Sequence, residues 1–318
     1  MTGAPLVSVI VVSWNSRAFL EGCLASVKEQ THPNVELIVV DNASTDGSAE
    51  LVRERYPSAA LIRNPQNLGF CAANNTGLKR AGGTYILFLN ADATLTPRYL
   101  EEALKPFSAD RRTGMVAGKV LRFDHHTLDT TGQFLTRSRR VRERGYGEPD
   151  RGQYDRPGEV FSVCGAVALV SRAMVDSVSL DGEFFDEDFF AFNEDLDAGW
   201  RARRLGWRCA YEPAAVAYHY RGGSQTARRD GPARRGEMAL RPPAIQAHIV
   251  KNRYLAILKN DTPWAFVRDL PFILMWDLAV WGWLALRSPR TLVLVWRQRR
   301  LLGRALAKRR ALRARAEA

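Results

Sequence analysis

Polar side chains follow three apolar segments within the first hundred residues. These segments end in the sequences SWNS (13–16), DNASTD (41–46) and NAD (90–92). The carboxyl ends of parallel strands meet at one edge of a sheet, so the three endings should converge on one crevice. Helix capping is the commoner role of Asp, Asn and Ser, but capping alone is an inadequate account of three such endings.

The turn after the first apolar segment has no glycines, and the chain has no Walker A sequence. A bound diphosphate would therefore need another partner. Mg²⁺ or Mn²⁺ can bridge diphosphate oxygens with only one or two protein ligands. Asp92, directly after an apolar segment, is the best candidate ligand.

A second acidic group lies in the aromatic stretch FDEDFFAFNEDLDAGWRARRLGW (185–207). Glu194, Asp195 and Asp197 fall at or near a helix start, where the helix dipole favours acids. Apolar surroundings and like-charged neighbours raise the pKa of a carboxyl group, which suits a general base. A charged first turn and a catalytic role both remain open on this pattern.

His219 follows a strand-like segment and precedes the sequence RGGS (221–224). A lone histidine is usually structural, but beside a basic glycine-rich loop it becomes a candidate metal ligand. The stretch 222–243 is predicted to be a mobile loop. Together with Arg221, its residues Arg228 and Arg229 could fold over the diphosphate, although exposed arginines are ordinarily just solvated.

The elements that must position these groups alternate in type. Strands are predicted at 7–13, 35–40, 59–63 and 85–89, and helices at 17–30, 44–56 and 69–81. This order predicts an α/β fold, with a parallel sheet and helices on both faces. Beyond Arg111 the pattern predicts loops with a few edge strands, then a strand at 160–171, a helix at 194–205, a strand at 208–211 and a helix at 246–258.

The composition is that of a globular protein, with 46% hydrophobic and 25% charged residues among 318. The net charge of +12 calls for an anionic partner: nucleic acid, lipid or a phosphorylated substrate. Four separated cysteines are expected to be buried and reduced. The first apolar run lacks a basic flank, so we interpret it as a buried strand and not as a signal peptide.

The C-terminal tail changes character. The segment LPFILMWDLAVWGWLAL (270–286) has one charge and three tryptophans, and a long arginine-rich stretch follows it. Such a pairing favours a helical tail lying in a membrane interface of anionic lipids. A buried helical hairpin with a solvated basic end is the alternative. Nucleic acid is disfavoured because no nucleic-acid motif accompanies the charge.

Six motifs in collinear order carry a family resemblance over residues 5–260: VSVIVVSWNS, VDNASTDGS, NPQNLGFCAANNTGL, GGTYILFLNAD, FFAFNEDLDAGWR and HYRGGS. Together they resemble the family 2 glycosyltransferases, most closely the rhamnosyltransferase-like branch that builds bacterial surface polysaccharides. The resemblance implies a GT-A fold. Its nucleotide-sugar-binding half would span 1–105, its acceptor-binding and catalytic half 106–260, and the membrane-associating tail 261–318.

The resemblance also implies roles for individual residues. Asn90 and Asp92 match the family's Asp-x-Asp metal motif with Asn in place of the first acid, and His219 matches a metal-binding histidine. Asp195 would be the catalytic base, paired with Glu194. The implied donor-binding residues are Ser13, Asn15, Asp41, Asn42, Asn67, Gly69, Asn74 and Asn90.

The function expected from these features is inverting transfer of a sugar from a nucleotide diphosphate donor, with Mg²⁺ or Mn²⁺ as cofactor. The resemblance suggests dTDP-rhamnose as the candidate donor. The acceptor would be a lipid-linked or polysaccharide glycan at the inner face of the cell membrane, with no nucleic acid involved. A nucleotidyltransferase acting on sugar phosphates and a non-catalytic membrane adaptor that binds nucleotide sugars are the alternatives. Release of nucleoside diphosphate or of pyrophosphate distinguishes the two enzyme classes.

Overall fold

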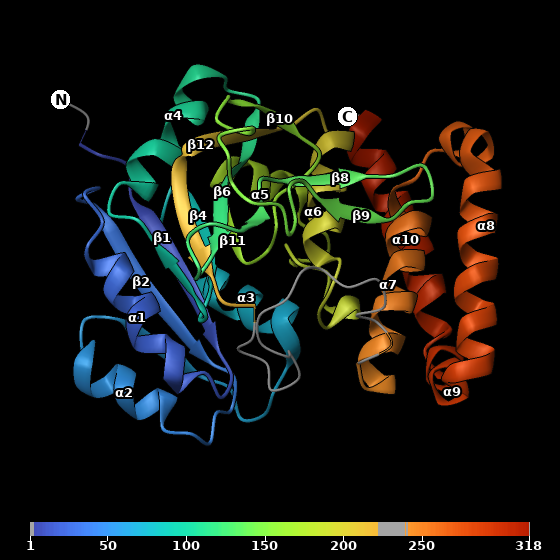
Figure 1. Cartoon of the computed structure of the whole chain (residues 1–318), viewed down its shortest axis with the longest axis horizontal. Helices are drawn as coiled ribbons and strands as arrows, with labels where there is room; N and C mark the ends of the chain where they lie inside the picture. The colour runs from blue at the N-terminus through green and yellow to red at the C-terminus, as the bar shows by residue number, and fades with distance from the viewer. Residues whose placement is uncertain (1–2, 222–238, 240, 318) are drawn as a thin grey trace.

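The computed structural model describes residues 3–221, 239 and 241–317. A ten-stranded mixed sheet lies at its centre with helices on both faces (Figure 1). The strand order is β10-β12-β6-β11-β4-β1-β2-β3, with β5 added to β12 and β7 to β6, while β8 and β9 form a separate hairpin. The strands are β1 Val7–Ser13, β2 Val35–Asp41, β3 Ala60–Arg63, β4 Tyr85–Asn90, β5 Ala93–Leu95, β6 Thr113–Arg122, β7 Leu128–Thr130, β8 Gln133–Leu135, β9 Val141–Glu143, β10 Gly158–Val160, β11 Val167–Ser171 and β12 Arg208–His219.

The helices cover two separate cores. Alternate residues of β1 face opposite ways, so Val9 and Val11 pack on one side of the sheet and Ile10 on the other. The helices are α1 Arg17–Lys28, α2 Ser48–Arg55, α3 Gly69–Arg80, α4 Tyr99–Ala109, α5 Arg172–Val178, α6 Glu194–Arg204, α7 Pro243–Asn260, α8 Pro263–Arg287, α9 Pro289–Arg297 and α10 Arg300–Glu317, with a 3₁₀ turn, η1, at Glu187–Phe189.

The N-terminal half confirms the predicted alternation and its parallel sheet. Strand β1 pairs in parallel with both β2 and β4, and the register places Ser13 beside Asp41 and Val12 beside Asn90. The three polar endings therefore do meet at one edge. One helix start was predicted wrongly: α2 begins at Ser48 and not at 44–45, because those residues bond to the loop after β1 instead.

The second half differs more from its prediction. Strand β6 is a long, buried strand in the interior of the sheet, where loops and edge strands were expected. Gly118 misled the prediction: a Cβ there would lie 2.3 Å from the carbonyl oxygen of Ala215, so the glycine permits the close approach of β12. The single strand predicted at 160–171 is two strands, β10 and β11, and the one predicted at 208–211 continues to His219.

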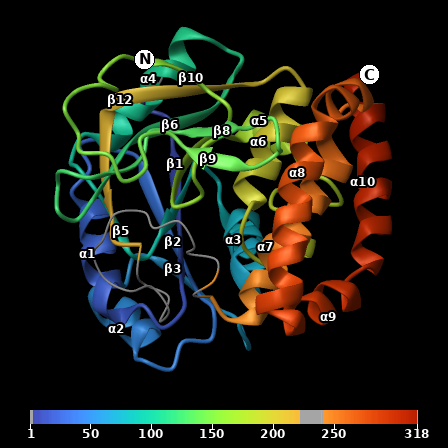
Figure 2. The ribbon, with the colours of Figure 1, turned by 45° about the vertical axis from the view of Figure 1, so that its right-hand side comes forward.

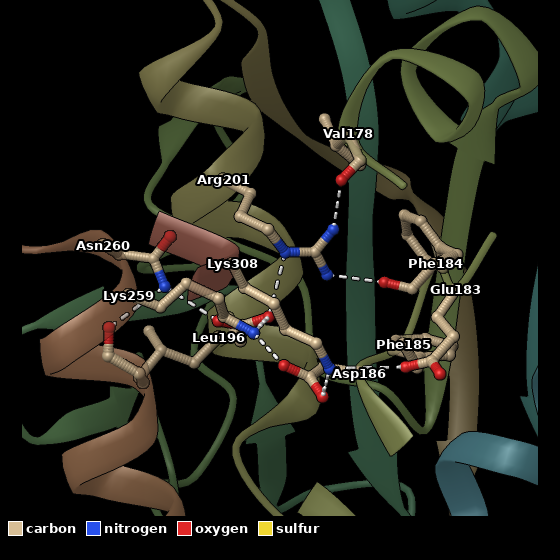
Figure 3. Close-up of polar contacts among 12 residues, drawn as sticks. Val178, Glu183, Phe184, Phe185, Asp186, Leu196, Arg201, Lys259, Asn260 and Lys308 are labelled. Atoms are coloured by element: carbon tan, nitrogen blue, oxygen red, sulfur yellow. Dashed lines mark hydrogen bonds and ion pairs between the residues drawn. The ribbon is translucent and has the colours of Figure 1, made fainter. Parts of the chain in front are cut away.

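Helices α7 to α10 stack against the α6 side of the sheet (Figure 2). Ionic contacts fix this packing (Figure 3): Lys259 of α7 and Lys308 of α10 both contact the carboxylate of Asp186. Lys259 also lies 2.9 Å from Asp197 of α6, and both side chains are fully buried. The basic tail is therefore anchored to the sheet domain through α10. The proposed boundaries at 105 and 260 remain predictions, and one sheet runs through both halves.

Helix α8 is long and apolar enough to cross a membrane, judged by length and composition alone. It presents an apolar face to solvent, with Trp264, Leu278 and Leu286 exposed by 76%, 74% and 84%. Its opposite side carries Asp269, which pairs with Arg139 beside the strands β8 and β9, and Asp277, which pairs with Arg253 of α7. The helix is thus held by its polar side, and its apolar side is left uncovered by the described residues.

Candidate active site

Asp41 is the last residue of β2, and one of its carboxylate oxygens has no hydrogen-bond partner among the described residues. The residue is 1% exposed, and its Oδ2 has no hydrogen-bond partner among the described residues. The nearest cation is Arg63, with Nε 3.6 Å from Oδ2. A buried carboxylate oxygen without a donor is costly, so a ligand N–H or O–H arriving there would be favoured.

The neighbouring predicted residues build the walls of this edge. Asn42 accepts hydrogen bonds from the loop before α3 and donates to Asn67 Oδ1 at 2.8 Å. Gly69 has φ +82°, and a Cβ there would meet the ring of Phe190 at 2.5 Å. Asn74 donates to the carbonyl of Phe70 within its own helix. These contacts show that the three asparagines and the glycine hold the loop before α3 and the start of that helix in place.

The ends of β1 and β4 lie beside that wall. Asn15, with φ +50°, joins two loops by accepting from the Thr45 amide at 2.8 Å. The Ser13 and Ser16 hydroxyls are 2.7 Å apart. Asn90 is half-buried, and its backbone N–H donates to the carbonyl of Ala166. Their predicted contact with a donor remains a prediction.

Asp92 and His219 meet at the end of the sheet. Nε2 of His219 lies 3.3 Å from Oδ1 of Asp92, and Nδ1 lies 2.9 Å from Oδ2 of the fully buried Asp129. Arg221 also contacts Asp129. Burial alone would lower the pKa of His219, but its bonds to Asp129 and Asp92 outweigh burial and raise that pKa to about 9.

This arrangement fits a divalent cation. A carboxylate behind Nδ1 fixes the imidazole so that Nε2 faces Asp92, which is the usual support of a metal-binding histidine. No group of three or more candidate ligands occurs in the described parts of the chain. Two protein ligands suffice for a cation that takes its other ligands from a diphosphate and water. Asp92 and His219 are the residues that would hold it.

Replacing Asp129 with asparagine is expected to weaken Mn²⁺ binding by about 10–100-fold, because the imidazole loses its orienting carboxylate. A Mn²⁺ titration with nucleoside diphosphate present would measure the change. Asp181→Asn is the matched control, since Asp181 is exposed and lies in a turn with φ +53°. Equal affinity in both variants would contradict the supporting role of Asp129.

Asp195 opens α6 after a strained loop. Phe190, Phe192 and Asn193 have φ values of 65°, 74° and 64°, a region that bulky residues rarely adopt. The buried side chain of Asn252 holds this loop by donating to three of its carbonyls, including that of Phe192. Such over-determined strain is typical of functional sites.

The carboxylate of Asp195 is half-buried and oriented by three donors. Its Oδ2 accepts from the Gly165 amide and from Gln133 Nε2, both at 2.9 Å, and its Oδ1 accepts from the Leu196 amide. Burial raises the pKa of Asp195 despite these bonds. A positioned carboxylate with a raised pKa is suited to accept a proton.

Glu194 differs from its neighbour. It is 6% exposed, and its Oε2 has no hydrogen-bond partner among the described residues. Burial first, and then the charge of Asp195, raises the pKa of Glu194 well above its ordinary value. The raised pKa favours the neutral form of Glu194, and its catalytic role beside Asp195 remains a prediction.

Three residues of this site escaped the sequence analysis: Asp129, Gln133 and Glu143. Gln133 Nε2 bridges Asp195 and Glu143, 2.9 Å from each. Burial raises the pKa of Glu143 to about 7, with Arg221 opposing and Asp195 assisting. All three residues lie on the short strands β7 to β9. Period-two alternation in 128–143 was the only available signal, and it is too short to stand out.

Asp129, behind the candidate metal-binding histidine, and Asp195, the candidate base, lie in one region. The Cys164 thiol, whose pKa burial raises well above the ordinary value, also interacts electrostatically with Glu143, Asp195, Arg221 and Asp129. Arg221 contacts Asp129, the partner of His219, and its side chain is 32% exposed, so it is only partly solvated. The other two lid arginines, Arg228 and Arg229, lie outside the described residues.

A family model described as glycosyl transferase family 2 matches residues 8–178, more than half of the chain. The chain belongs to glycosyl transferase family 2. A putative teichuronic acid biosynthesis glycosyltransferase of Bacillus subtilis is 36% identical over 104 residues, which are 32% of this chain and 41% of that protein. The chain thus spans less than half the length of this family member.

Two further comparisons extend over more of this family 2 chain. An N-acetylglucosaminyl-diphospho-decaprenol L-rhamnosyltransferase of Mycobacterium tuberculosis is 26% identical over 237 residues, 67% of this chain and 75% of that one. A mannosyltransferase of Pyrobaculum calidifontis, solved with GDP-Man and Mn²⁺, has a TM-score of 0.57 at 22% identity, covering 99% of this chain and 87% of that one. The GT-A fold predicted from the sequence is confirmed.

Proposed function

We propose that this family 2 chain is an inverting glycosyltransferase that uses a nucleotide diphosphate sugar and a divalent cation. The observation that carries the proposal is that a candidate metal-binding pair and a candidate general base lie in one region. Asp92 and His219 lie together and would hold a cation, and Asp195 is an oriented carboxylate with a raised pKa. Gln133 donates to both Asp195 and Glu143, and the charge of Arg221, which pairs with Asp129, acts on Glu143.

The chain's own residues account for the proton and the stereochemistry. Asp195 takes the proton of an acceptor hydroxyl as that oxygen bonds to the anomeric carbon. The bond from this carbon to the donor phosphate breaks on the opposite face, so the nucleoside diphosphate leaves with the electron pair and the configuration inverts. Asp41 receives a hydrogen bond from the donor's base or ribose. A cation at Asp92 and His219 would neutralise charge on the departing diphosphate.

A screen of nucleotide sugars with Mn²⁺ or Mg²⁺, with and without EDTA, tests this proposal. Release of nucleoside diphosphate that EDTA abolishes is expected. Release of pyrophosphate would indicate a nucleotidyltransferase instead, and donor binding without turnover would indicate an adaptor. The first donor to test is dTDP-rhamnose, because the relative that aligns over most of the chain is named as a rhamnosyltransferase. A lipid-linked acceptor is proposed on the same ground.

Attachment to the inner face of the cell membrane is proposed for the exposed face of α8. The large exposed apolar residues of this helix are Trp264, Val267, Phe272, Leu274, Met275, Leu278 and Leu286. Helix α9 adds Val293 and Trp296, exposed by 52% and 67%, and arginines at 287, 290 and 297 flank the surface. An amphipathic helix with flanking arginines suits an interface of anionic lipid. On this proposal the helix lies on the membrane.

Leu278→Glu is expected to weaken binding to anionic vesicles by about tenfold or more, because burial of one large apolar side chain is worth about 1.5–3 kcal/mol. Flotation with phosphatidylglycerol vesicles would measure it. Ser58→Glu, which adds the same charge at the exposed turn between α2 and β3, is the control and should bind like the unaltered chain. Equal flotation of both variants would exclude this face as the attachment surface.

A further inference from the structure

The β8–β9 hairpin links the base to the exposed helix. One end holds Gln133, which donates to Asp195. The other end reaches α8, as both views show (Figures 1 and 2). Arg139 at the tip lies 2.6 Å from Asp261 and 2.8 Å from Asp269, and Arg137 lies 2.9 Å from Asp269. These ion pairs fix the position of the tip against α8.

Two arginines of this hairpin have no such partner. Neither Arg140 nor Arg142 forms an ion pair with a described carboxylate, whereas nearby Arg253 pairs with Asp277 at 2.6 Å. The Arg140 guanidinium instead covers the ring of Trp276, 3.7 Å from its centroid. Burial lowers the pKa of Arg140, and the charges of Arg142 and Arg253 lower it further. The tip thus concentrates positive charge that an anion would stabilise.

The position of this charge matches one kind of ligand. Trp276 belongs to α8, whose exposed face presents Met275 and Leu278 to the proposed membrane surface. Strand residues rise about 3.4 Å each, so Arg140 lies about 10 Å along the hairpin from Glu143, the neighbour of Asp195. This is the scale of one sugar unit with its linking phosphate. Side chains alternate along β9, so Arg142 faces away from Glu143 and Asp195. An acceptor bound at Arg140 and Arg142 would therefore extend past the edge of the hairpin to bring its sugar to Asp195.

Resting on the proposed function, we propose that Arg140 and Arg142 bind the diphosphate headgroup of a lipid-linked acceptor, whose chain enters the membrane beside α8 and whose sugar reaches Asp195. Guanidinium groups bind phosphate oxygens through paired, charge-assisted hydrogen bonds, and an arginine stacked on tryptophan is already oriented for this. Asp277 is occupied by Arg253 and Asp269 by Arg137 and Arg139, so these carboxylates leave Arg140 available.

Flotation of the full chain with two sets of vesicles tests the site. One set is phosphatidylcholine with polyprenyl diphosphate, and the other is phosphatidylcholine with phosphatidylglycerol at equal total charge. The unaltered chain should prefer the diphosphate. Arg140→Gln and Arg142→Gln should each reduce that preference by about fivefold. Arg111→Gln, at an exposed position on the turn after α4, removes the same charge and should leave the preference unchanged.

Absence of any preference in the unaltered chain, or a preference that survives both substitutions, would overturn the site. Arg142 is exposed, so its variant tests the proposal even if Arg140→Gln folds poorly. The outcome is separable from that of the proposed function. Slow hydrolysis of the sugar donor with Mn²⁺, followed by nucleoside diphosphate release, needs neither arginine, and its absence would count against the glycosyltransferase and not against the lipid site.

Discussion

Asp195→Asn is expected to lower the turnover number by about 10²–10⁴-fold, the usual cost of losing a general base. Asparagine keeps the size of the side chain and can still accept from the Gly165 amide, but it cannot take the acceptor's proton. Donor affinity should change little, because the predicted donor contacts lie at Asp41 and Asp92. Single-turnover measurement of nucleoside diphosphate release, beside direct titration with the donor, separates the two quantities.

Glu194→Gln provides the matched comparison. Burial raises the pKa of Glu194 and so favours its neutral form, which glutamine resembles, so the loss of turnover should be far smaller than in Asp195→Asn. A larger loss in Glu194→Gln would transfer the base role to Glu194.

Turnover in the unaltered chain should fall as the pH is lowered, because Asp195 must be ionised to accept a proton. Because the pKa of Asp195 is raised, this fall should begin at a higher pH than for an ordinary aspartate. Glu143, with a pKa of about 7, titrates beside it, so this limb belongs to both groups.

Local pattern was sufficient for the parallel strands β1, β2 and β4. The runs that form β1, β2 and β4 have few polar residues, and their polar endings mark the sheet edge directly. Asp92 and His219, 127 positions apart, are brought together because β12 pairs with β5 directly after β4: His219 lies opposite Ala93. The sequence could propose that pair only from the residue types and the family resemblance.

Long-range packing decided what sequence pattern could not. Gly118 resembles a loop residue in sequence, but it is required because Tyr99 and Ala215 occupy the space where a side chain would be. Glu143 and Gln133 acquire their role only when a three-residue strand pairs with another and turns both side chains toward Asp195. The tail is a similar case. Its basic character suggested a solvated or membrane-bound end, while Lys308 is in fact buried.

Lys308→Met is expected to lower the free energy of unfolding by about 3–5 kcal/mol, because it leaves buried carboxylates without one of their partners. Nζ of Lys308 lies 2.6 Å from Asp186 and 3.1 Å from Asp188 (Figure 3 shows the contact with Asp186). Stabilities of whole domains are only about 5–15 kcal/mol, so the effect is large. Urea unfolding followed by tryptophan fluorescence would measure it. Lys105→Met is the control: Lys105 is 57% exposed, and its partner Glu102 keeps Arg98 at 2.8 Å, so the substitution should cost at most about 1 kcal/mol.

The pH dependence of this ion pair gives an independent check. Burial raises the pKa of Asp186, but Lys259 and Lys308 outweigh it and hold the pKa below the ordinary 3.8, so its contribution to stability is complete above that pH and is lost as the pH falls. The pKa of Lys308 lies above the ordinary 10.5, because Asp186 and Asp188 outweigh burial, so its contribution is complete below that pH and is lost as the pH rises. The difference between Lys308→Met and the unaltered chain should therefore be greatest between these two pH limits and should shrink outside them.

An equal, small loss of stability in Lys308→Met and Lys105→Met would mean that α10 is not needed by the sheet domain. A large loss confined to Lys308 would make α10 part of the support for η1, the turn that leads into the strained loop before Asp195.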